Sequence, residues 1–174
     1  MKLFVVCTVL LLSLLAKAEE ETFVPIRYKS CKSIFEIVSV ETSKCPLDEE
    51  SRCIFMHEDT PTIRIGFKPD RDVQNLKAQV NARFTDKHVS FDLDNDNACN
   101  NQNLTCPLKA GELYYYSQKV TIAKEYPAIE VIVNWLLNDP AVLEAKKEPY
   151  FDEDGERVKS DLCVVFMAKV NEKQ

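Results

Sequence analysis

The feature of this 174-residue chain that most restricts its fold is a period of two in its apolar residues. Residues 62–68 alternate polar and apolar side chains, and residues 76–83, 89–94 and 129–137 repeat the pattern. A period of two places successive side chains on opposite faces of a strand, whereas a helix needs a period near 3.6. The sequence therefore predicts an all-β domain in which two antiparallel sheets bury their apolar faces against each other.

One segment departs from this pattern. Residues 139–147 predict a short helix, with Asp139 as its N-cap and Pro140 in its first turn. Asp154-Gly155 then predicts a hairpin turn.

The N-terminal residues predict export. Lys2 precedes an uncharged, mainly apolar stretch at residues 3–15, and Ala16-Lys17-Ala18 has the small-x-small form of a cleavage site. The stretch is shorter than the ~20 apolar residues that span a bilayer. We therefore expect a signal peptide at residues 1–18 and one mature domain at residues 19–174.

The charge of the expected mature chain argues against several partners. Removal of Lys2 and Lys17 changes the formal net charge from −6 to −8. Proteins that bind nucleic acids or anionic membrane surfaces are usually basic. No nucleic-acid partner is expected.

Six cysteines remain after signal cleavage: Cys31, Cys45, Cys53, Cys99, Cys106 and Cys163. An even number in an exported chain predicts three disulfides. A zinc site would need closer pairs, and the two histidines, His57 and His88, are isolated. Six cysteines allow fifteen pairings. The economical one joins sequence neighbours and leaves Cys31 with Cys163.

Motifs of enzymes, cofactors and metals are not found. The chain has no Gly-rich phosphate loop, nucleophile elbow or His-Glu-x-x-His motif. Residues 92–96 resemble the start of a calcium loop, but Asn97 and Asn103 replace the required Gly and Glu. We expect a plain turn there, no catalytic residue, no metal and no cofactor.

Asn103-Leu104-Thr105 is a sequon for N-glycosylation. It lies between Cys99 and Cys106, so it falls on an exposed loop if those two are paired. We therefore expect glycosylation at Asn103.

The inward apolar stripes include Phe91, Tyr116, Tyr126 and Trp135. Aromatic and aliphatic side chains of this kind line ligand pockets, but they also fill ordinary cores. Alternation by itself leaves both interpretations open.

Three stretches resemble the ML lipid-recognition family. They are Cys106-Pro107-Leu108-x-x-Gly111-x-x-Tyr114-x-Tyr116, Glu125-Tyr126-Pro127-Ala128-Ile129 and Val133-Asn134-Trp135-Leu136-Leu137. The resemblance implies an immunoglobulin-like sandwich that holds a lipid between its sheets. It also implies disulfides that join the first cysteine to the sixth, the second to the third and the fourth to the fifth.

The resemblance implies a set of lipid-binding residues. They are Val40, Val89, Phe91, Ile122, Tyr126, Pro127, Val131, Val133, Trp135 and Met167, the last where the family has a proline. The chain departs from the family at His88, Ser90 and Asp92, which replace prolines, and in a longer segment at residues 138–161.

The expected function is that of a secreted, monomeric carrier of a sterol or fatty-acid-like lipid, with lysosomal delivery as a second destination. A membrane or a receptor would accept the lipid. The alternative is an innate-immune or semiochemical-type protein that presents a microbial lipid or fatty acid, for which a basic pocket rim is expected. A third interpretation is a filled structural sandwich.

Overall fold

A computed structural model describes residues 21–85, 87–101, 103–141 and 159–173. The expected signal peptide, most of the predicted helix at 139–147, the Asp154-Gly155 turn and most of the long segment at 138–161 lie outside the described residues. At the start of the predicted helix, the backbone N–H of Ala141 donates to Asp139 Oδ1 at 3.0 Å, as an N-cap requires.

Apart from the helical residues 140–141, the regular elements of the described residues are strands, as the period of two predicted. In chain order they are β1 (Phe23–Pro25), β2 (Lys29–Ser30), β3 (Glu36–Ser43), β4 (Cys53–Met56), β5 (Thr62–Lys68), β6 (Lys77–Phe84), β7 (Lys87–Phe91), β8 (Asn100–Asn101), β9 (Leu104–Thr105), β10 (Tyr114–Lys119), β11 (Glu130–Asn138) and β12 (Leu162–Asn171).

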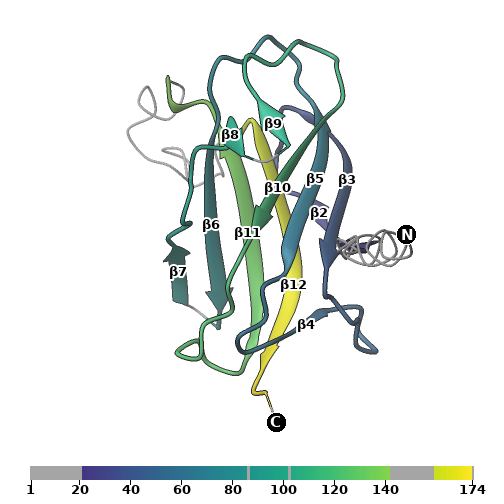
Figure 1. The fold of residues 1–174 in the computed structure, drawn as a ribbon, viewed down its shortest axis with the longest axis vertical. Coiled ribbons are helices and arrows are strands. Elements are labelled where there is room, and N and C mark those ends of the chain that lie inside the picture. The colour runs from purple at the N-terminus through teal and green to yellow at the C-terminus, as the bar shows by residue number, and fades with distance from the viewer. Residues whose placement is uncertain (1–20, 86, 102, 142–158, 174) are drawn as a thin grey trace, which may run out of the picture.

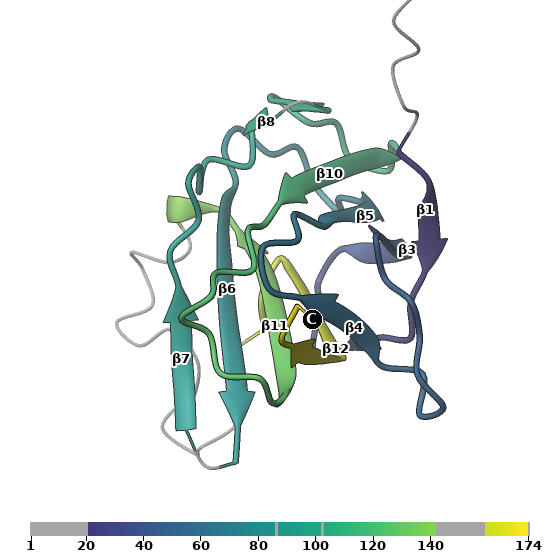
Figure 2. The same ribbon diagram turned by 60° about the horizontal axis from the view of Figure 1, so that its bottom comes forward.

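Two sheets make up the body of the molecule (Figure 1). One has the order β1-β3-β5-β10, and the other β2-β12-β11-β6-β7. Among the strands that the structure describes, pairing is antiparallel except where β4 runs parallel to β12. Figure 2 shows the two sheets as separate layers, with β4 at the end that comes forward. The prediction of a sandwich of two antiparallel sheets is confirmed.

Register fixes which side chains face the interior. On β11, Val131, Val133 and Trp135 lie opposite Ala168, Phe166 and Val164 of β12. On the other side, Val133 and Trp135 lie opposite Ala82 and Val80 of β6. Since paired residues share a face, these side chains form one apolar inner surface.

Three disulfides brace the sandwich, and they pair the cysteines in the expected order. Cys31 is joined to Cys163, Cys45 to Cys53 and Cys99 to Cys106, with Cα–Cα distances of 5.1, 5.0 and 5.2 Å. The first ties the β2 end of the chain to β12. The third encloses the β8–β9 hairpin.

Strand β10 ends at Lys119, before Ile122. Ile122 instead belongs to the connection between β10 and β11. Its N–H donates to the carbonyl of Asp59 at 2.9 Å, and its carbonyl accepts from the N–H of Glu58 at 2.7 Å. The turn between β4 and β5 therefore pairs with the backbone N–H and carbonyl of Ile122. Strand β5 would pair with these groups if β10 continued as a strand.

Candidate functional site

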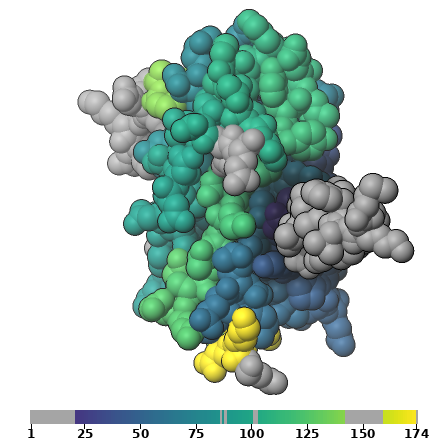
Figure 3. Space-filling model, viewed as in Figure 1, coloured from purple at the N-terminus to yellow at the C-terminus, as the bar shows by residue number. Residues whose placement is uncertain are grey.

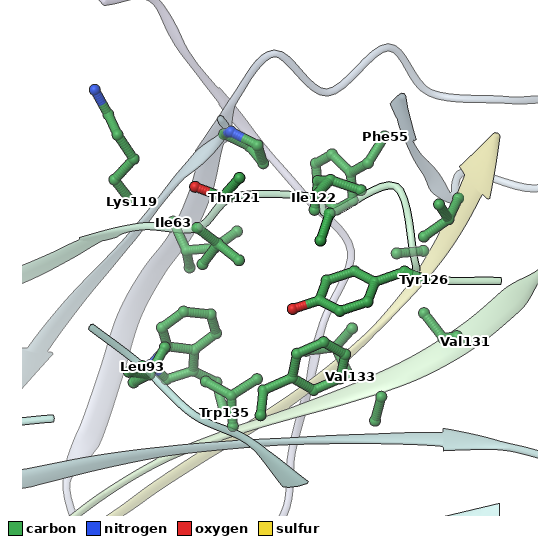
Figure 4. A pocket seen from close by; sticks show the side chains of 18 of the residues that line it. Phe55, Ile63, Leu93, Lys119, Thr121, Ile122, Tyr126, Val131, Val133 and Trp135 are labelled. Atoms are coloured by element: carbon green, nitrogen blue, oxygen red, sulfur yellow. The ribbon is translucent and has the colours of Figure 1, made fainter. Parts of the chain in front are cut away.

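A cavity of about 220 Å³ lies between the sheets, at the end of the sandwich near the β10–β11 connection. Its wall is made mainly of aliphatic and aromatic side chains (Figure 4). The lining residues are Phe55, Pro61, Ile63, Val80, Ala82, Phe91, Asp92, Leu93, Asp94, Lys119, Val120, Thr121, Ile122, Ala123, Tyr126, Val131, Val133, Trp135, Phe166, Ala168 and Val170.

The larger sheet supplies one wall of this cavity. Small and medium side chains from its three central strands, such as Ala82, Val133 and Ala168, leave space above the sheet. The opposite wall comes from Ile63 of β5 and from the β10–β11 connection. The interior is thus apolar because both walls use the inward positions of alternating segments.

Trp135 closes the inner end of the cavity and is only 2% exposed. Its ring packs against Tyr116 of the opposite sheet, with centroids 6.2 Å apart. Burial raises the pKa of Tyr116 well above its ordinary value, while the neighbouring Trp135 side chain lowers it to a smaller extent. Tyr116 is therefore neutral at physiological pH, and its hydroxyl adds no charge beside the cavity.

Tyr126 and Phe91 form the aromatic pair at the cavity. Their rings make an edge-to-face contact with centroids 5.0 Å apart. Figure 4 shows the Tyr126 hydroxyl directed into the space between the walls. This hydroxyl gives the largely apolar cavity a hydrogen-bonding group that can donate or accept.

Charged groups lie at the rim and not in the interior. Asp92 and Asp94 are exposed on one side, and Lys119 is exposed on the other. They belong to the stretch after β7 and to the end of β10. The rim is therefore mixed in charge, with two carboxylates and one ammonium.

The connection that carries Tyr126 is anchored to the β4–β5 turn. His57 Nε2 lies 2.9 Å from the carbonyl oxygen of Tyr126, to which its N–H can donate. Lys124 forms an exposed ion pair with Glu58 at 3.3 Å. These contacts hold the position of Tyr126 from outside the cavity.

The structure brings together six of the residues that the sequence assigned to lipid binding. Phe91, Ile122, Tyr126, Val131, Val133 and Trp135 all line the cavity. The other four do not line it, and their part in lipid binding stays a prediction.

Met167 and Val89 lie outside the cavity, with exposures of 48% and 42%. Met167 pairs with Ile132, so it points to the outer face of the sheet, and its neighbours Phe166 and Ala168 face inward. Successive residues of a strand point to opposite faces, so Met167 is directed away from the cavity. Val89 has the parity of Phe91 but lies nearer the start of the edge strand β7.

Val40 and Pro127 lie outside the cavity for different reasons. Val40 is buried in β3 opposite Ile65, in the part of the core that is filled. Pro127 is exposed in the β10–β11 connection, next to Tyr126.

The sequence analysis missed Phe166, Ala168 and Val170, although a signal was present. In the segment 162–170, Lys169 shares the parity of Met167, and a lysine marks the solvent face. The inward row of β12 could have been taken from that position. The contribution of Phe55 and Pro61 has no comparable signal, because it depends on where β4 and its turn come to rest.

Within the described ranges, no group of three or more His, Cys, Asp or Glu side chains is arranged to hold a metal ion. In the same ranges, no helix is long and apolar enough to cross a membrane. Asp96, from the stretch that resembles a calcium loop, forms an ion pair with Lys77 at 2.8 Å.

Comparison with known proteins decides the family. The sequence model of the ML domain matches residues 24–142. This chain belongs to the ML-domain family.

The similarity to several relatives extends over most of this ML-domain chain and most of each relative. Putative protein heh-1 of Caenorhabditis elegans is 35% identical over 95% of this chain and 99% of its own. The ecdysteroid-regulated 16 kDa protein of Manduca sexta is 31% identical over 79% and 88%. The NPC intracellular cholesterol transporter 2 of Mus musculus is 29% identical over 78% and 87%.

A solved structure shares the fold of this ML domain. The Niemann-Pick type C2 protein of the Japanese carpenter ant superposes with a TM-score of 0.65. The match covers 84% of this chain and 100% of the ant chain, at 23% identity.

Proposed function

We propose that this ML-domain protein binds one apolar lipid, of sterol size, between its sheets and carries it to an acceptor. The observation that carries the proposal is the apolar cavity beside Val133 and Trp135, which has charged groups only at its rim. A relative is named as a cholesterol transporter, which supports a sterol as the cargo. Binding and transfer of this kind need no reaction chemistry.

The cavity must widen to admit such a ligand. Its volume of about 220 Å³ is below the roughly 300–1,000 Å³ of typical small-molecule sites. The wall at Phe91 belongs to β7, which pairs only with β6 among the described strands. None of the three disulfides joins β7 or the Lys119–Tyr126 stretch to another element. This side of the sandwich is therefore the side that moves.

The energetics allow reversible binding without a charge pair. A sterol that hides roughly 400 Å² of apolar area gains about 10 kcal/mol at ~25 cal/mol per Å². Lost motion and widening offset roughly 4 kcal/mol or more. The remainder, about 6 kcal/mol or less, corresponds to a Kd of roughly 40 μM or weaker, which suits a carrier that must also release its lipid.

The rim favours an uncharged ligand head. Asp92 and Asp94 repel a carboxylate or phosphate, and Lys119 offsets only part of that effect. The alternative, presentation of an anionic microbial lipid, requires a basic rim. The same charges lead us to rank a sterol above a fatty acid as the cargo.

Secretion is part of the proposal. Three disulfides are typical of chains that fold in an oxidising compartment. The apolar N-terminal stretch supplies the expected export signal. We propose an extracellular or lysosomal location and a monomeric carrier.

The test uses the single tryptophan of the chain, Trp135, as a reporter inside the cavity. The protein secreted from insect cells is stripped of lipid and titrated with dehydroergosterol, whose absorption overlaps tryptophan emission. Saturable energy transfer with one site per chain is expected. Absence of transfer, together with no lipid in organic extracts of the untreated protein, would contradict the proposal. A co-purified glycolipid would support the alternative.

A further inference from the structure

The sequon at residues 103–105 occupies the tip of a small hairpin. Asn101 pairs with Leu104, and Asn103 lies in the turn between β8 and β9. The Cys99–Cys106 disulfide encloses this hairpin. Asn103 is exposed, and β8 and β9 lie on the face of the molecule turned toward the viewer in Figures 1 and 3.

The side-chain amide of Asn103 is oriented by the neighbouring sheet. Its Nδ2 donates to the Oγ of Ser117 on β10 at 3.2 Å. A primary amide has two N–H hydrogens. N-glycosylation replaces one of these hydrogens. The other can keep the hydrogen bond to Ser117 while the attached sugar extends along β10.

A polar recess of about 240 Å³ lies beside this amide. Ser117 is part of its wall, together with Asn95, Asn100, Lys119, Thr62 and Glu21. Burial opposes ionisation of Glu21, but hydrogen bonds from Ser43 and Thr62 and the nearby Lys119 outweigh it and lower the pKa of Glu21. The recess therefore presents an ionised acceptor, an ammonium donor, hydroxyls and amides. These are the groups that hydrogen-bond to the hydroxyls and acetamide of a sugar.

We propose that Asn103 carries an N-linked glycan whose first N-acetylglucosamine docks in this recess, against Ser117 and Lys119. The recess shares Lys119 with the rim of the lipid cavity, but attachment of the glycan needs no lipid in that cavity. Attachment depends only on entry of the chain into the secretory pathway. The docked sugar adds contacts between the hairpin and β10 and so stabilises the folded state.

Occupancy is tested by mass spectrometry of the secreted chain, before and after treatment with peptide-N-glycosidase F. The full-length protein is compared with a version in which an established secretory signal replaces residues 1–18, so that entry into the pathway is assured. We expect one glycan at Asn103, its loss in Asn103→Gln and Thr105→Ala, and its retention in Thr105→Ser. An unmodified Asn103 in the chain with the replaced signal would overturn the proposal.

Docking is tested by thermal unfolding of protein trimmed to a single N-acetylglucosamine. We expect its Tm to exceed that of Asn103→Gln by about 2–4 °C. The control adds Glu49→Asn to Asn103→Gln, which moves the sequon to Asn-Glu50-Ser51 on an exposed turn away from the recess. No rise is expected for that control. An equal rise in both proteins, or none in either, would overturn the docking.

Discussion

The two ends of the sandwich interior use the same alternation but are packed differently. At the filled end, Phe35 and Phe67 stack with centroids 5.8 Å apart, and Phe67 also meets Tyr114 at 6.4 Å. Leu108, Leu137 and Leu162 there have no solvent exposure. At the open end, Ala82, Val133 and Ala168 occupy the inward positions, and the cavity lies between them and the β10–β11 connection.

The difference shows what separates a filled core from a binding site in this fold. The size of the inward side chains and the segment that packs over them decide it, and polarity does not. Both ends are apolar, and the two apolar regions meet at Trp135. Large side chains meet across the sheets at the filled end, whereas small ones face a connection at the open end. Stability should therefore depend mainly on the first region and lipid binding on the second.

The largest expected effect is on stability at the filled end. Phe67→Ala should reduce the free energy of unfolding by about 3–5 kcal/mol, because it leaves a void among fully buried side chains. Phe91→Ala at the open end should cost only about 1–2 kcal/mol, since Phe91 is only partly buried. Urea unfolding with the disulfides intact, followed by Trp135 fluorescence, measures both. Equal costs would remove the distinction between the two ends.

The next effect is on binding at the open end. Val133→Phe should weaken sterol binding about 30-fold or more, because the added ring occupies the cavity, and it should leave the fold intact. Ile132→Phe is the matched control, since Ile132 lies on the same strand but faces outward opposite Met167. Titration by energy transfer from Trp135 gives both affinities. A similar loss in the two variants would contradict the proposed site.

A smaller effect is expected for the polar group inside the cavity. Tyr126→Phe should weaken binding of a hydroxylated sterol about 3- to 10-fold, the usual range for one hydrogen bond. The affinity for a steroid hydrocarbon without oxygen should be unchanged. If both ligands lose affinity equally, the Tyr126 hydroxyl positions the wall and does not contact the ligand.

The smallest effect concerns the rim. Asp92→Asn combined with Asp94→Asn should raise the affinity for an anionic lipid, such as a fatty acid, about 2- to 5-fold, because exposed charge interactions are weak. The gain should shrink in high salt, and sterol binding should not change. Fatty-acid titrations at low and high ionic strength check this. An affinity for the fatty acid that stays constant would show that the rim does not select the ligand head.

Much of the molecule could be predicted from its residues. The alternation at 62–68 and 129–137 gave strands β5 and β11, and the cysteine spacing gave an economical pairing that the structure contains. Six cavity residues followed from the family resemblance. Met167 faces away from the cavity because successive residues of a strand alternate between faces, and Lys169, which has the same parity, marks that outer face.

The sequence by itself determined which side chains face inward, because strand geometry fixes alternation locally and apolar faces must be buried. Only the tertiary structure decided whether those faces touch. That outcome depends on where the Lys119–Tyr126 connection and the turn after β4 settle over the small residues of the larger sheet. Such long-range packing has no local pattern, so the position of the cavity emerges only when segments distant in sequence meet.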